Sequence, residues 1–195
     1  MIIDTLVEGP TDEAVARKLI ATCGHEFGTG YGKQGHGYLR QKATGFNVLA
    51  KYGNPILMLV DFIDTEFECP PEVPPEWLPS RNDKMLLRVV VRELESWLLA
   101  DVKGLANFLG ISEATIPRNP ENLPDPKQVL VNLARRSRRR VIRDALVPHP
   151  NISAVVGPGY AAAIEEFVSR HWAIEAASER ASSLERCVAR LGELR

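Results

Sequence analysis

The sequence predicts an α/β fold in which a mainly parallel sheet is covered by helices on both faces and a mostly helical C-terminal extension follows. Three short, nearly all-apolar segments are typical of buried strands; they are IIDTLV (2–7), ILMLV (56–60) and MLLRVVV (85–91). Segments with helical spacing of apolar residues follow these strands, at 12–22, 39–52 and 93–101. Because this alternation is typical of parallel sheets, we expect an α/β core over residues 1–101.

The ends of the first helix carry local signals. Thr11 is suited to cap its beginning, and Gly24 lies just past its end. A glycine-rich segment at 28–37 is interpreted as a loop, with room for a short strand beside it, that either brings backbone amides to a phosphate or covers a site. The proline-rich segment ECPPEVPPEWLP (68–79) is also interpreted as a loop, because proline lacks a backbone donor.

The pattern changes after Asp101, where prolines separate helical segments. We expect a mostly helical extension over residues 102–195 that packs on the core. Helices are predicted at about 127–146, 160–171 and 179–194, and a late strand at 152–156.

Composition excludes several classes of protein. The 195 residues carry 24 Lys and Arg against 25 Asp and Glu, with 45% hydrophobic residues, which is typical of a globular chain rather than a disordered one. Three scattered cysteines argue against a disulfide framework or a structural zinc site. No apolar run approaches the roughly 18 residues of a membrane span, and the N-terminus lacks the basic start of a signal peptide. We therefore expect a cytoplasmic protein with no membrane partner.

Charge is strongly segregated along the chain. Six acids and no base lie between Asp61 and Glu76, whereas seven bases and no acid lie between Lys127 and Arg143. This segregation can produce a cation-binding region and an anion-binding surface, or simply two solvated faces.

Acidic residues follow each of the three predicted strands. Glu8 follows the first strand by one residue, Asp61 and Asp64 follow the second, and Glu93 and Glu95 follow the third. The carboxyl ends of parallel strands share one edge of a sheet, which is where ligands bind. Carboxylate oxygens without His or Cys suit Mg²⁺ or Mn²⁺. The pattern predicts a divalent metal site, although acids at helix starts are also common as stabilising charges.

Several segments together resemble TOPRIM domains. LVEGPTDEAVARKL resembles the first TOPRIM motif, a Glu-Gly pair between a strand and a helix, and ILMLVDFID resembles the second, a strand that ends in metal-binding aspartates. RELESWLLAD, the PxxLPDPKxxL segment at 120–130 and the later GPGY and SSLER segments resemble small stand-alone bacterial TOPRIM-like proteins of unknown function, which are related to OLD-type defence nucleases.

The resemblance implies a TOPRIM or Rossmann-like fold and specific residue roles. Glu8 would be the catalytic acid or base and a metal ligand, Gly9 the tight-turn residue beside it, and Asp61 a catalytic residue and metal ligand. TOPRIM proteins usually have Asp-x-Asp, whereas this chain has Ile63 at the second acidic position. Asp64, or Glu93 or Glu95, would then supply the missing metal ligand.

A TOPRIM-like site implies Mg²⁺- or Mn²⁺-dependent hydrolysis of DNA or RNA, with phage defence as the implied role. One alternative is a catalytically inactive TOPRIM-like protein that binds nucleic acid or a partner protein; a homodimer also stays open. Primase-like transfer of nucleotides is a third possible function. An aspartyl phosphatase is a fourth, although such an enzyme needs Asp-x-Asp and Ile63 does not fit.

The basic segment is the predicted nucleic-acid-binding surface. Arginines on a predicted helix would contact phosphates with a sequence-independent, salt-dependent affinity. The alternatives are a solubilising face, or a helix that pairs with the acidic segment at 61–76. The predicted contact residues are Lys127, Arg135, Arg136, Arg138, Arg139 and Arg140. Histidines at 25, 36, 149 and 171 show no ligand spacing, and we expect no metal-binding role for them.

Overall fold

The computed structural model describes residues 1–194, which form two compact units. The first unit comprises Met1–Val91 and the C-terminal segment that begins at Ser183, and the second comprises Arg92–Ser182. This division differs from the boundary predicted after residue 101: residues 92–101 belong to the second unit, and the segment that begins at Ser183 belongs to the first. No helix among the described residues combines the length and apolar character needed to cross a membrane.

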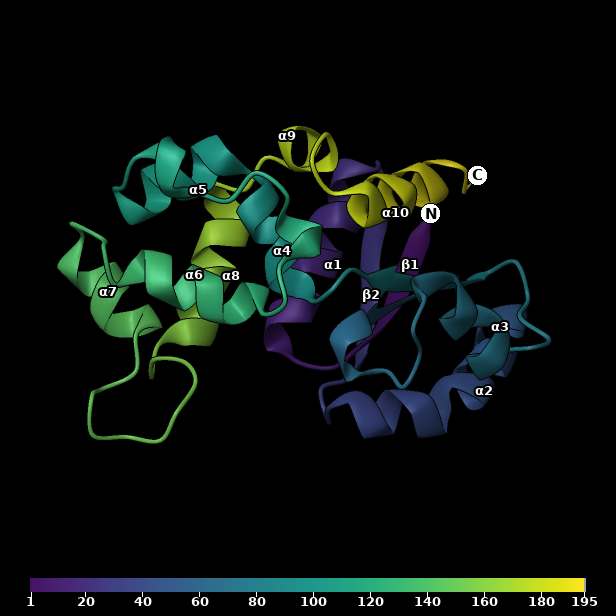
Figure 1. Ribbon diagram of the computed structural model, residues 1–195. Helices are drawn as coiled ribbons and strands as arrows, with labels where there is room; N and C mark the ends of the chain where they lie inside the picture. The colour runs from purple at the N-terminus through teal and green to yellow at the C-terminus, as the bar shows by residue number, and fades with distance from the viewer. Residues whose placement is uncertain (195) are drawn as a thin grey trace. The chain divides into compact units, whose positions relative to one another are not determined.

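The first unit is built on a four-stranded, all-parallel sheet (Figure 1). The order of the strands is β2-β1-β3-β4. The strands are β1 (Ile2–Val7), β2 (Glu26–Gly32), β3 (Ile56–Asp61) and β4 (Met85–Val90), and the helices are α1 (Pro10–Thr22), α2 (His36–Tyr52), α3 (Val73–Trp77) and α10 (Ser182–Gly192). The predicted α/β fold with a parallel sheet is thus confirmed.

Helices flank both faces of this sheet. The chain passes through α1 from β1 outward to β2, and through α2 from β2 back across β1 to β3. Because such crossovers are right-handed, opposite directions of travel place α1 and α2 on opposite faces. The alternating direction of the side chains along β3 is consistent with helices on both faces. Ile56, Met58 and Val60 are buried in one core with α2 and α3, whereas Leu57 and Leu59 face the other side.

The loop predicted for the glycine-rich segment is wrong over most of its length. Residues 26–32 form the edge strand β2, paired with β1. A Cβ at Gly28 would overlap the Asp4 carboxylate, one at Gly30 the Glu13 carboxylate, and one at Gly32 the Val7 carbonyl. Close approach to β1 and α1 therefore explains the alternate glycines, with no need for a phosphate.

The proline-rich segment also differs from the prediction. It contains a 3₁₀ turn over Pro70–Glu72 and the short helix α3, both of which carry prolines in their first turn. Proline is tolerated there because the first N–H groups of a helix have no partner within the helix. Val73 and Trp77 are buried in the core of the first unit and anchor this short helix.

The second unit is helical around Trp97, Phe108 and Phe167, which are almost completely buried. The Asp101 carboxylate links residues that lie far apart along the second unit, because it accepts hydrogen bonds from Gly104 N (2.9 Å) and Ala173 N (2.8 Å). The helices are α4 (Leu94–Ala100), α5 (Val102–Leu109), α6 (Pro126–Ala134), α7 (Arg140–Leu146), α8 (Tyr160–Arg170) and α9 (Ile174–Ser178).

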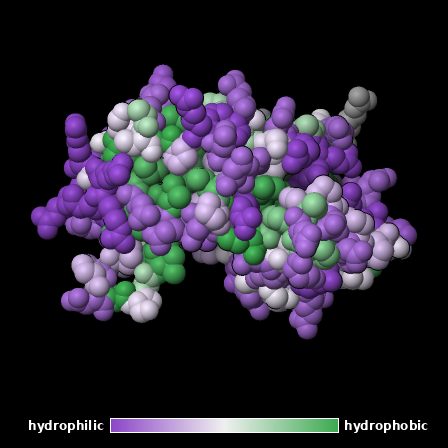
Figure 2. Space-filling model, in the orientation of Figure 1, coloured by the Kyte–Doolittle hydropathy of each residue, from purple (hydrophilic) through white to green (hydrophobic). Residues whose placement is uncertain are grey.

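Two predictions for this region are wrong. The single helix expected over 127–146 is divided into α6 and α7 by the segment 135–139. The Ser137 hydroxyl is buried there, donates to Leu109 O (2.6 Å) and accepts from Arg139 N (3.1 Å), which stabilises the break. Residues 152–156 form no strand; Ile152 and Val155 are exposed. Figure 2 shows a hydrophobic spot on the loop after α7, within a largely hydrophilic surface.

Candidate metal centre

The carboxyl ends of β1 and β3 form the topological switch point of the sheet. These two strands are neighbours, and the chain continues from β1 toward one edge of the sheet and from β3 toward the other. Ligands of open α/β sheets bind in the crevice outside this point. Glu8 immediately follows β1, and Asp64 lies in the 3₁₀ turn Phe62–Asp64 that follows β3.

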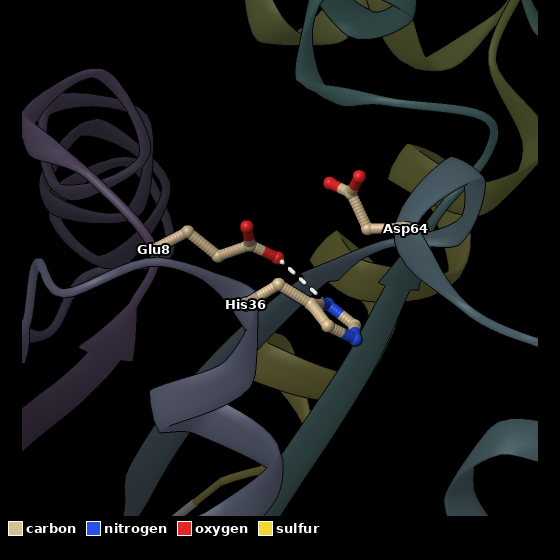
Figure 3. A group of neighbouring side chains, drawn as sticks. All are labelled: Glu8, His36 and Asp64. Atoms are coloured by element: carbon tan, nitrogen blue, oxygen red, sulfur yellow. Dashed lines mark hydrogen bonds and ion pairs between the residues drawn. The ribbon is translucent and has the colours of Figure 1, made fainter.

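Three side chains converge at this point: Glu8, His36 and Asp64 (Figure 3). His36 Nδ1 lies 3.4 Å from Glu8 Oε1. Each of the three residues offers one ligand atom, and these atoms lie within 4.8 Å of one another. The side chains of His36 and Glu8 are 24% and 16% exposed, so the group is within reach of solvent.

Backbone hydrogen bonds set the position of His36 beside Glu8. Lys33 N donates to Val7 O (2.8 Å), and Gly35 N donates to Glu8 O (3.1 Å). Gly35 has a φ of 79°, which glycine adopts without strain, and it is the N-cap of α2. The turn that follows β2 is therefore fastened to the end of β1, and α2 begins with His36 at the site.

Gly9 and Asp64 are placed by short connections. Glu8 and Gly9 are the only residues between β1 and α1, and Gly9 is the N-cap of α1 in an extended conformation. The tight connection predicted for Gly9 is present, without a left-handed backbone. On the other strand, Thr65 donates to Phe62 O through its hydroxyl (2.8 Å) and its N–H (3.0 Å), which closes the turn that carries Asp64.

An aromatic side chain fixes the imidazole of His36. The Trp77 ring contacts it edge-on, with 5.2 Å between centroids and 67° between planes. The Arg40 guanidinium lies over the same Trp77 ring, 5.0 Å from its centroid, and its Nη2 is 3.9 Å from Glu66 Oε1. His36 and Arg40 are four residues apart on α2 and so share one face of the helix. A cationic group thus lies on the His36 side of α2.

The sequence predicted Glu8 and Asp64 correctly as neighbours and missed His36. The signal for His36 is its position just after the end of a parallel strand, and the glycines of β2 conceal that strand in the sequence. Among the residues that the structure describes, this group of potential ligands does not include Asp61, which is the last residue of β3. The role of Asp61 stays a prediction.

Glu93 and Glu95 belong to the second unit, where both contact Lys127. Lys127 Nζ lies 3.2 Å from Glu93 Oε2 and 3.6 Å from Glu95 Oε1, and Lys127 N donates to Glu93 Oε1 (2.6 Å). The Tyr160 hydroxyl donates to Glu95 Oε1 (2.7 Å). These carboxylates therefore have protein partners within their own unit, and metal binding by them stays a prediction.

Burial raises the pKa of Glu95 to about 7, and Lys127 opposes the shift while the neighbouring Glu93 adds to it. Lys127 itself was predicted to bind nucleic acid. Its ammonium group already makes two ion pairs, so a phosphate would compete with both carboxylates.

The arginines of the basic segment are exposed but do not form one face of a helix. Arg135 is the C-cap of α6, Arg139 is the N-cap of α7, and Arg140 begins α7 and pairs with Asp144 (3.4 Å). Arg136 and Arg138 lie in the connection between the two helices. The segment therefore presents a turn of exposed cations on the second unit.

The three side chains at the switch point are of the kinds that bind divalent metal ions in proteins. Two atoms bonded to one ion at about 2.1 Å lie about 3.0 Å apart in octahedral geometry and about 3.4 Å apart in tetrahedral geometry. The separation of 3.4 Å between His36 Nδ1 and Glu8 Oε1 lies at the upper end of this range and is also that of a hydrogen bond between the two side chains. Asp64 adds a second carboxylate from a third direction (Figure 3).

Comparisons of the chain with protein-family models, with curated proteins and with solved structures give no match. The resemblance to TOPRIM domains therefore stays a hypothesis that rests on the sequence motifs.

Proposed function

We propose that this protein hydrolyses phosphodiester bonds of nucleic acid with a divalent metal ion, Mg²⁺ or Mn²⁺, held by Glu8, His36 and Asp64. The observation that carries the proposal is the convergence of these three side chains at the switch point of a parallel sheet. His36 lies 28 positions after Glu8, and Asp64 lies 28 positions after His36. Each of the three follows the end of a different strand. Such convergence is typical of ligand sites in open α/β sheets.

A bound divalent ion would supply charge neutralisation at the scissile phosphate and a water of lowered pKa. Glu8, His36 and Asp64 would hold and orient that ion. Arg40, on the same helix face as His36 and partly exposed, would orient a phosphate oxygen of the substrate. The exposed arginines of the second unit, from Arg135 to Arg140, would bind the phosphate backbone without reading its sequence.

Asp61 keeps its place in this proposal as the second catalytic residue that the TOPRIM resemblance implies. It ends β3, three residues before Asp64. Substituting it separately from Asp64 tests which acid serves the reaction.

The experiment is a cleavage assay on labelled DNA and RNA with Mn²⁺ or Mg²⁺. Glu8→Gln and Asp64→Asn should each lower the rate by at least about 100-fold, since a metal contributes several kcal/mol of transition-state stabilisation. Asp61→Asn should also lower it. The matched control is Glu26→Gln, an exposed acid at the opposite end of β2, which should change the rate by less than about twofold.

Equal cleavage by the parent chain, Glu8→Gln and Asp64→Asn would refute the proposal. Binding of nucleic acid without any metal-dependent cleavage would favour the inactive binding protein instead.

A further inference from the structure

The candidate metal centre contains a kind of ligand that the all-carboxylate site suggested by the sequence lacks. It offers one imidazole nitrogen of His36 beside the carboxylates of Glu8 and Asp64. Mg²⁺ and Ca²⁺ prefer oxygen ligands, and Mg²⁺ gives up its water reluctantly. Imidazole favours first-row transition-metal ions, whose affinity for a mixed nitrogen and oxygen site exceeds that of Mg²⁺.

Two contacts hold the imidazole in a position to bind. Nδ1 lies at hydrogen-bonding distance from Glu8 Oε1 (3.4 Å), so an ion bound there would replace the proton between them, and the edge-on contact with the buried Trp77 limits rotation of the ring. The backbone of the same segment is fixed by the hydrogen bond from Gly35 N to Glu8 O. The nitrogen ligand is thus preorganised, and little ordering is needed when an ion binds.

We propose that His36 makes this centre selective for a first-row transition-metal ion over Mg²⁺. The inference rests on the metal site of the proposed function but not on cleavage itself. Of the two ions that the carboxylates alone allow, Mg²⁺ and Mn²⁺, the nitrogen ligand favours Mn²⁺, because imidazole binds transition-metal ions more strongly than it binds Mg²⁺.

The test is calorimetric titration of the full chain with MnCl₂ and with MgCl₂, in the absence of nucleic acid. We expect Mn²⁺ to bind at least about tenfold more tightly than Mg²⁺. His36→Gln should weaken Mn²⁺ binding by about tenfold or more and Mg²⁺ binding by less than about threefold, so that the preference disappears. His149→Gln, which changes a histidine of the second unit, should leave both affinities unchanged.

A second measurement uses the unaltered chain. Paramagnetic Mn²⁺ bound beside His36 should quench the fluorescence of Trp77, whose ring lies against the imidazole. The quenching should saturate at the Mn²⁺ concentrations of the calorimetric titration and be lost in Trp77→Phe. Saturable quenching that is absent from Trp77→Phe places the bound Mn²⁺ beside His36 even if His36→Gln folds poorly, and quenching that an equal concentration of Mg²⁺ reduces by half or more would overturn the selectivity.

Equal affinity for Mn²⁺ and Mg²⁺, or equal weakening of both by His36→Gln, would overturn the inference, as would the absence of any metal binding. Selective Mn²⁺ binding by a chain that cuts neither DNA nor RNA would support the inference and refute the proposed function, so the two failures are distinguishable.

Discussion

Replacing Glu95 by Gln should make the stability of the protein less dependent on pH. Glu95 is 2% exposed and accepts a hydrogen bond from the Tyr160 hydroxyl, while Lys127 Nζ lies 3.6 Å away. Burial raises its pKa from 4.5 to about 7 despite the nearby ammonium group. Gln has the shape of the neutral carboxyl and can accept the same hydrogen bond, but it cannot ionise.

The sign follows from the direction of the pKa change. Because the folded-state pKa lies above the unfolded-state value, the contribution of Glu95 to stability is complete below pH 4.5 and is lost as the pH rises through about 7. A pKa raised from 4.5 to about 7 corresponds to about 3 kcal/mol, since each tenfold change in proton affinity is about 1.4 kcal/mol. Glu95→Gln should therefore become more stable relative to the parent chain by about 3 kcal/mol between pH 4.5 and pH 8.

The assay is urea unfolding of the parent chain and of Glu95→Gln at several values of pH from 4 to 8. Glu165→Gln, an exposed acid on α8 of the same unit, is the control and should follow the parent at every pH. A difference between Glu95→Gln and the parent that stays constant over this range would show that burial does not oppose ionisation of Glu95.

Two further predictions concern the strand β2 and the basic segment. Gly32→Ala should lower the free energy of unfolding by about 2 kcal/mol or more, because Gly32 has a φ of 94° and a Cβ there would overlap the Val7 carbonyl. Gly45 lies on the open surface of α2, so Gly45→Ala should raise the free energy of unfolding by up to about 1 kcal/mol in the same denaturation assay. Neutralising Arg135, Arg136 and Arg139 together should reduce the slope of log affinity for duplex DNA against log salt by about three, measured by fluorescence anisotropy; an unchanged slope would exclude these arginines from the interface.

Three of the four strands could be predicted because their signal is local. β1, β3 and β4 are runs of buried apolar residues, and the structure places them within one residue of the predicted ends. β2 has the composition EFGTGYG, and glycine normally disfavours strands. Its conformation depends on tertiary packing, since Gly28 and Gly30 leave room for the carboxylates of Asp4 and Glu13.

The candidate site was predictable to the same extent as the strands. Glu8 and Asp64 follow strands that the sequence identified, so their meeting at one sheet edge could be expected. His36 follows the strand that was missed. The arginines of the basic segment are predicted to lie on one helix, which the structure divides in two. The helical spacing over 127–146 gives no sign of this break, because the break depends on the hydrogen bond from the buried Ser137 hydroxyl to Leu109 O.

The position of His36 is therefore a property of the β1–β2 pairing rather than of α2. Val7 pairs with Gly32, and the next hydrogen bonds, from Lys33 N to Val7 O and from Gly35 N to Glu8 O, continue this pairing into the turn. A slip of one residue in a strand pairing would turn its side chains to the opposite face and move His36 away from Glu8. The glycines that allow β2 to lie against β1 thus also define the distance between the His36 imidazole and the Glu8 carboxylate. The unusual composition of this strand is in this way linked to the geometry of the candidate metal centre.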